Sequence, residues 1–252
     1  MKYVSLLLLV LFFSGCQTVP SSDSDGRTGS LGRESNSPAN TNISLAGEYL
    51  RRGNYKSALI KAKKAVAQDP GNSNAHLILA LVYERLGENA LANAAYRKAL
   101  SVDRNNAYAL NAYGAYLCKL DEYRKSFRYF ERAVNNPLYP TPWIALTNAG
   151  VCALGIDDEK KAEQYFSRAL KEKPTHPQAL LNMAELAYKQ GKYLSARAFI
   201  QRYREVASPV PKLLYISILT ERQLGNKDQV SSDELLLFSQ FPESDEARKL
   251  GK

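Results

Sequence analysis

Histidine is scarce in this sequence: among 252 residues there are only two, His76 and His176. No HExxH motif and no zinc-finger spacing of cysteine and histidine is present, so the residues of a typical metal site are missing. His76 falls at a packing position of a helical pattern, and His176 lies in a turn next to Pro177. We therefore predict no metal-binding site.

A glycine-rich phosphate loop is also missing from the sequence. The acidic run Asp157-Asp158-Glu159 lies between two expected helices. Carboxylates in such a turn are typical of a solvated helix cap rather than of a general acid/base pair. Since the sequence offers no other convergent polar site, we predict that the protein is not an enzyme. We expect no catalytic residues, no cofactor and no small-molecule substrate.

Positive charge, in contrast, is in excess: 34 Lys and Arg against 25 Asp and Glu give a formal net charge of +9. Such a balance fits nucleic acid, an anionic membrane surface, an acidic partner or simply a solvated basic surface. Aromatic residues do not alternate with a Lys/Arg stripe on a sheet, as they do in many RNA-binding proteins. We therefore expect no nucleic-acid binding and interpret the charge as a solvated surface.

The first sixteen residues, MKYVSLLLLVLFFSGC, have the pattern of a secretory signal. Lys2 precedes a run from Val4 to Phe13 that only Ser5 interrupts. This run is shorter than the ~20 residues that a membrane-spanning helix needs. No other apolar stretch of the sequence is long enough to cross a membrane.

The end of this segment, Phe13-Ser14-Gly15-Cys16, resembles the bacterial lipoprotein signal, although Leu is usual where Phe13 stands. The resemblance implies cleavage before Cys16 and lipidation of its thiol; the alternative is an ordinary signal peptide with an incidental cysteine. Residue 17 is Gln and not Asp, the usual inner-membrane retention signal. We therefore expect an outer-membrane anchor and a folded part in the periplasm.

Residues 17–42 differ in composition, since Ser, Gly, Asn, Thr and Pro dominate and apolar residues are rare. Such a segment cannot bury enough surface to offset its chain entropy. The predicted organisation is a signal peptide over 1–15, a lipidated Cys16 with a disordered tether over 16–42, and a folded domain over 43–252.

The folded domain repeats with a period of 34 residues, and the fourth unit is displaced by two. Small residues that recur at one position allow two helices to approach closely. Glycine can end the first helix of each unit, and proline stops the second. The recurring residues include Ala46, Ala80, Gly114 and Gly150, then Gly53, Gly87 and Gly191, and then Pro70 and Pro174.

This pattern resembles the tetratricopeptide repeat (TPR). The resemblance implies an all-α fold, a right-handed superhelix of six helix-turn-helix repeats with a concave protein-binding face. The approximate repeats are 39–72, 73–106, 107–140, 143–176, 177–210 and 211–244. Residues 245–252 are expected to begin a capping helix.

In TPR arrays, set positions of each first helix line the binding groove. The positions that match in this sequence predict a groove formed by Ile43, Leu50, Leu77, Leu81, Tyr108 and Asn111. Its apolar front would suit an apolar strand or an amphipathic helix. The alternative is that the aliphatic side chains only pack against a neighbouring helix. The Lys/Asn clamp of carboxylate-binding co-chaperones is missing.

Cys118 and Cys152 lie 34 residues apart on the expected first helices of repeats three and four. The periplasm favours oxidation, and a bridge forms if the two Cα atoms come within about 7 Å. The other interpretation, two buried small hydrophobic residues, stays open.

Three segments go beyond the general repeat: residues 111–118 (NAYGAYLC), 137–140 (PLYP) and 148–152 (NAGVC). Their order resembles the type IV pilus biogenesis/stability lipoproteins, the PilF/PilW family of TPR pilotins. The resemblance implies a protein that binds the outer-membrane secretin of the pilus and promotes its localisation or multimerisation, or that stabilises pili. The rival interpretations are a TPR lipoprotein of outer-membrane protein assembly and a scaffold for other envelope complexes.

Overall fold

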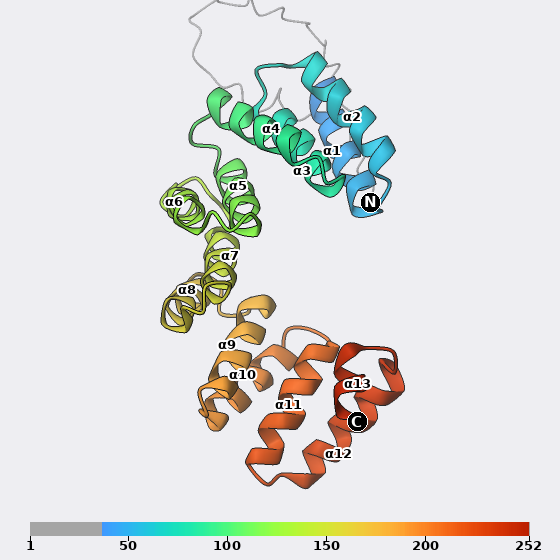
Figure 1. Ribbon diagram of the computed structural model, residues 1–252, viewed down its shortest axis with the longest axis vertical. Helices are drawn as coiled ribbons and strands as arrows, with labels where there is room; N and C mark the ends of the chain where they lie inside the picture. Colours follow the sequence, from blue (N-terminus) through green and yellow to red (C-terminus); the bar gives the residue numbers. More distant parts are fainter. Residues whose placement is uncertain (1–36, 252) are drawn as a thin grey trace, which may run out of the picture. The chain divides into compact units, whose positions relative to one another are not determined.

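The computed structural model describes residues 37–251, and every regular element among them is an α-helix (Figure 1). The helices are α1 (Pro38–Arg51), α2 (Tyr55–Gln68), α3 (Ser73–Arg85), α4 (Asn89–Val102), α5 (Ala107–Lys119), α6 (Tyr123–Val134), α7 (Pro142–Leu154), α8 (Glu159–Glu172), α9 (Pro177–Lys189), α10 (Tyr193–Arg204), α11 (Pro211–Gln223), α12 (Lys227–Gln240) and α13 (Asp245–Leu250). The predicted all-α TPR fold is confirmed. The predicted signal peptide and Cys16 lie outside the described residues.

The helices pack as six antiparallel pairs, from α1 with α2 to α11 with α12. Each second helix contacts the first helix of the next pair, and first helices of successive pairs also touch. The short α13 packs against α11, which agrees with the expected capping helix. No helix among residues 37–251 is both long and apolar enough to cross a membrane.

The boundary of the predicted tether is wrong, because α1 begins at Pro38 and not after Asn42. The Ser37 hydroxyl accepts a hydrogen bond from the Asn40 amide at 3.1 Å and caps the helix. The buried Asn42 side chain donates to Gln68 Oε1 at 2.8 Å, on the partner helix. Residues 38–42 are mostly polar and so resemble a tether in the sequence. In the structure, the side chains of Thr41 and Asn42 form hydrogen bonds within the first repeat.

The first helix of a pair ends where one residue adopts a left-handed conformation. Gly53 does so with φ of 73°, and the Asn54 amide then closes a hydrogen bond to the Tyr49 carbonyl at 2.9 Å. Asp157 takes the same role in repeat four with φ of 56°. Asp158 then caps α8 by accepting from the Lys161 amide at 3.0 Å. The acidic run is thus a helix cap, as its sequence predicted.

The last two pairs are joined by charged side chains. Asp233 of α12 is buried and accepts two hydrogen bonds of 2.8 Å from the Arg204 guanidinium of α10. The buried Glu221 of α11 is likewise bound by Arg197 of α10. Each buried carboxylate has a cationic partner, which its loss of hydration requires.

Candidate protein-binding surface

Two tyrosines join the start of α5 to the loop before α7. Tyr139, in the PLYP segment, is buried, and its ring meets that of Tyr108 edge-on at 5.4 Å between centroids. Tyr108 remains 49% exposed, and the neighbouring Leu138 is 87% exposed. The PLYP segment therefore holds Tyr139 inside, against the ring that Tyr108 of α5 partly exposes, and leaves the adjoining Leu138 exposed. The exposure of Leu138 was not predicted, although the PLYP segment itself marked the place.

One turn further along α5, two asparagines connect the helices. Asn148 of α7 donates a hydrogen bond of 3.0 Å from Nδ2 to Asn111 Oδ1. Both side chains are half-buried. Burial raises the pKa of Tyr139, and a hydrogen bond with the Asn111 side chain acts in the opposite direction. The Asn111 side chain therefore bonds with Asn148 across the α5–α7 contact and with Tyr139 of the tyrosine pair.

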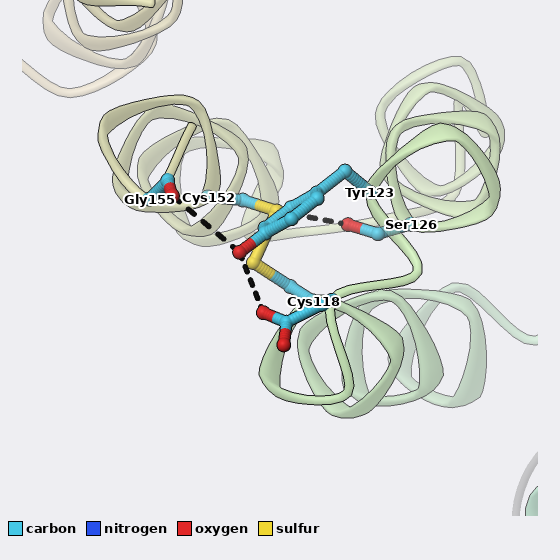
Figure 2. Close-up of a disulfide and its surroundings, with 6 residues drawn as sticks. Cys118, Tyr123, Ser126, Cys152 and Gly155 are labelled. Carbon is cyan, nitrogen blue, oxygen red and sulfur yellow. Dashed lines mark hydrogen bonds between the residues drawn. A yellow bond between two sulfur atoms is a disulfide. The ribbon is translucent and has the colours of Figure 1, made fainter. Parts of the chain in front are cut away.

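A disulfide joins Cys118 near the end of α5 to Cys152 near the end of α7 (Figure 2). The Cα atoms lie 5.9 Å apart, within the range that a bridge requires. Cys152 is buried, and its Sγ atom lies 3.2 Å from the Ser126 hydroxyl of α6. The sequence left two interpretations open, a disulfide or two separate buried cysteines, and the structure contains the disulfide.

The hydroxyl of Tyr123, the first residue of α6, lies between the two cysteine-bearing helices (Figure 2). It donates to the Asp121 carboxylate at 2.6 Å and lies 3.4 Å from the Gly155 carbonyl oxygen. The three segments that set this sequence apart from a general TPR thus meet along α5 and α7. An aromatic pair, an amide pair and a disulfide hold the two helices in one relative position.

The other predicted groove residues lie on α1 and α3. Ile43 and Leu50 pack against the core that contains Ala46, and Leu77 and Leu81 pack between the first repeats. All four side chains are only half-buried. The structure therefore places them in inter-repeat packing, while part of each side chain stays accessible.

The described part of the chain contains no cluster of side chains that suits a metal ion. Among residues 37–251, no group of three or more His, Cys, Asp or Glu side chains could hold a metal ion. The buried His76 places Nε2 2.9 Å from the Pro70 carbonyl oxygen, which fits its expected packing role.

Sequence reasoning missed one further feature, a hollow rimmed by arginines of α4 and α6. The run of cations between residues 124 and 132 was the clue to it.

Comparisons with known proteins match both the repeat and the whole chain. Tetratricopeptide-repeat families match residues 44–109 and 157–210. The chain is 30% identical over 239 residues to the type IV pilus assembly protein PilF of Pseudomonas aeruginosa. The match covers 95% of this chain and 93% of PilF.

Solved structures give the same result. The structure of Pseudomonas aeruginosa PilF has a TM-score of 0.75 at 30% identity, over 85% of this chain and 96% of that one. The crystal structure of PilW, a widely conserved type IV pilus biogenesis factor, has a TM-score of 0.75 at 31% identity. It is matched over 86% of this chain and its full length.

Proposed function

Because this chain belongs to the PilF/PilW family of TPR proteins of type IV pilus biogenesis, we propose that it acts there as a pilotin. In this role it binds the outer-membrane secretin of the pilus and promotes the localisation and multimerisation of that secretin. The protein works by holding its client and carries out no reaction. Its place is the outer membrane, anchored by lipid on Cys16, with the TPR domain in the periplasm.

The observation that carries the proposal is the near-complete match with PilF together with the α5–α7 contact. The segments that resemble pilotins are not scattered, since Tyr108 meets Tyr139, Asn111 meets Asn148, and Cys118 is bonded to Cys152. A surface whose helices are already fixed loses little conformational entropy when a partner binds. Exposed Tyr108 and Leu138 are the side chains available for that contact.

The lipid and the repeat domain have complementary roles in this mechanism. Two or more acyl chains anchor a protein far more firmly than one. Tethering a bound secretin subunit near its target membrane raises its effective concentration there, without any new contact. Multimerisation would then be favoured at the membrane over the rest of the periplasm.

The first test measures secretin multimers in cells that lack the gene and in cells that carry Cys16→Ala. We expect loss or mislocalisation of multimers in both strains, together with recovery of secretin by the lipidated wild-type protein. A bait that recovers barrel-assembly or peptidoglycan factors, with unchanged secretin multimers, would contradict the proposal. Normal multimers with loss of surface pili would indicate the family's other role, pilus stabilisation.

The second test addresses the surface. The double variant Tyr108→Ala/Leu138→Ala removes exposed side chains and should reduce secretin recovery several-fold at an unchanged circular dichroism spectrum. The control is Leu235→Ala on α12, a residue that is 72% exposed and far along the chain from this surface. Equal recovery with both variants would show that the client binds elsewhere.

A further inference from the structure

The outer sides of α4 and α6 carry many cations and few acids. Helix α4 contains Arg97 and Lys98 and no acidic residue. Helix α6 contains four cations and the single acid Glu131. That carboxylate is already bound, since it accepts a hydrogen bond of 2.8 Å from Arg168 of α8. Lys125 pairs with Glu122, directly before α6, but the other cations of α4 and α6 form no ion pair within residues 37–251.

Two of these cations, together with Arg104 of the α4–α5 loop, border an open hollow of about 500 Å³, here called the basic hollow. Arg97, Arg104 and Arg132 lie at its rim, and Leu100, Tyr113 and Tyr129 line it. A second hollow of about 210 Å³ shares Tyr129 and Arg132 and adds Lys125 and Arg128. The two hollows thus adjoin at Tyr129 and Arg132, and their linings combine cationic side chains with the rings of Tyr113 and Tyr129.

The lining of the basic hollow is held in place before any ligand arrives. The rings of Tyr113 and Tyr129 meet edge-on at 4.8 Å, and the Tyr113 hydroxyl donates to Asn93 Oδ1 at 2.7 Å. Burial raises the pKa of Tyr113 to about 12, and the charge of Arg97 opposes that rise. Tyr113 is therefore neutral, and it supports the more accessible ring of Tyr129 from behind.

One arginine of the rim is also positioned. The Arg132 guanidinium lies 5.7 Å from the centre of the Tyr129 ring and donates to the Arg104 carbonyl oxygen at 2.7 Å. The side chains of Arg97, Arg104 and Arg128 form no ion pair within residues 37–251. Each offers guanidinium N–H groups in the planar arrangement that binds one carboxylate through two parallel hydrogen bonds.

We propose that the basic hollow binds an acidic segment of a partner protein, with carboxylates on the arginines and an apolar or aromatic side chain on the partly exposed Tyr129, which the buried Tyr113 supports. A hollow with an apolar contact at Leu100 and Tyr129 fits a protruding side chain, whereas a flat lipid surface would meet only its edge. The adjoining second hollow accommodates further acidic residues of the same extended segment. This surface uses other residues than the α5–α7 contact, so the inference stands whether or not the client there is a secretin.

The experiment measures binding of a fluorescein-labelled peptide of four Glu-Glu-Tyr triplets to the full-length protein in nonionic detergent. The comparison peptide replaces every Glu with Gln. The test variant is Arg97→Gln/Arg128→Gln/Arg132→Gln. The control variant, Lys56→Gln/Lys63→Gln/Lys64→Gln, removes the same charge from exposed positions of α2.

We expect the acidic peptide to bind the wild type at least tenfold more tightly than the Gln peptide, and more weakly as salt rises. The arginine variant should lose at least tenfold in affinity, and the lysine control less than threefold. No binding by the wild type, or equal losses in both variants, would overturn the inference.

A parallel arm measures co-sedimentation with vesicles of phosphatidylethanolamine and phosphatidylglycerol. If the arginine variant loses vesicle binding tenfold yet keeps its peptide affinity, the basic hollow contacts a membrane and the inference is wrong. Unchanged vesicle binding together with lost peptide binding supports it.

Discussion

Gly114 and Gly150 occupy the same position of α5 and α7, and each faces a phenylalanine ring of the second helix of its repeat. A Cβ atom on Gly114 would lie 2.9 Å from two carbons of the Phe130 ring. In the first two repeats the same position holds Ala46 and Ala80. The missing methyl group in repeats three and four thus lets the phenylalanine ring lie directly against the first helix, whereas in repeat two the buried Tyr96 shares a cluster with Ala80.

Gly150→Ala should destabilise the protein. Its Cβ would lie 2.6 and 2.8 Å from Cδ1 and Cζ of Phe166, a buried side chain without space to move. Overpacking of this kind costs about 1–3 kcal/mol, and the better helix propensity of alanine returns about 0.5–1 kcal/mol. We expect a net loss of about 1–2 kcal/mol in the free energy of unfolding, measured by urea denaturation.

The matched control is Gly47→Ala in α1, where the added Cβ would meet only Ile78 Cδ1, at 3.9 Å. This variant should gain about 0.5–1 kcal/mol, because the helix improves and nothing clashes. Losses of similar size in both variants would show that crowding by Phe166 does not decide the outcome.

At the scale of helices, α5 and α7 are joined covalently as well as by packing. The disulfide connects residues 34 apart, and in the chain-entropy model a loop of this size stabilises by about 3–4 kcal/mol. Reduction with dithiothreitol should therefore lower the urea midpoint of the wild type. The double variant Cys118→Ala/Cys152→Ala should have a low midpoint that dithiothreitol leaves unchanged. Equal midpoints for the reduced and oxidised wild type would refute this expectation.

Helices α6 and α8 are joined by a pH-dependent ion pair. The pKa of the Glu131 carboxyl is lowered, chiefly because Arg168 donates hydrogen bonds to it. A carboxyl group whose pKa is lower in the folded state stabilises that state at pH values above its unfolded pKa of about 4.3. This stabilisation is lost as the pH falls through the folded pKa. Since both side chains are partly exposed, the effect should be below about 1 kcal/mol.

Glu131→Gln should therefore be less stable than the wild type at neutral pH, and the difference should vanish in acid. Urea denaturation at pH 7 and at pH 3 measures this directly. Arg168→Gln is the companion variant and should lose its own deficit in the same pH range. A deficit of Glu131→Gln that is as large at pH 3 as at pH 7 would contradict the assignment.

For residues 37–251 as a whole, stability should vary along the chain, because each repeat contacts mainly its neighbours. The largest buried cluster extends from Ala107 in α5 to Ile216 in α11. The cluster beneath α13 contains only four buried residues: Leu214, Ile218, Leu237 and Ala247. Central helices therefore have packed neighbours on both sides, whereas α12 and α13 have them on one side.

Hydrogen exchange should follow this order, with the slowest backbone amides in α7 and α9 and faster exchange in α12 and α13. Mass spectrometry of the protein after timed exchange into heavy water gives the rates by peptide. A variant with Leu237→Ala should accelerate exchange in α11 to α13 and leave α7 unchanged. Uniform rates along the repeats, or acceleration that reaches α7, would show that the described part of the chain opens as one unit.

Much of the fold was readable from the sequence. The 34-residue recurrence of Ala46, Ala80 and Gly114 identifies paired helices, because only small residues let two helices cross closely. Local effects also set helix ends, as at Gly53 with its positive φ. The start of α1 was missed although Ser37 followed by Pro38 is a local capping signal, because the segment is polar and the bond from Asn42 to Gln68 depends on a partner helix.

The repeat pattern thus determined the all-helical fold and the pairing of helices, and residues 111–118, 137–140 and 148–152 indicated the relation to type IV pilus proteins. Only the tertiary structure decided that Cys118 and Cys152 are bonded and that Leu77 and Leu81 pack between repeats. It alone brought Arg97 and Arg132 around one hollow. The physical reason is that a helical period records which side of a helix is buried. The distance between side chains on different helices depends on how those helices pack against each other.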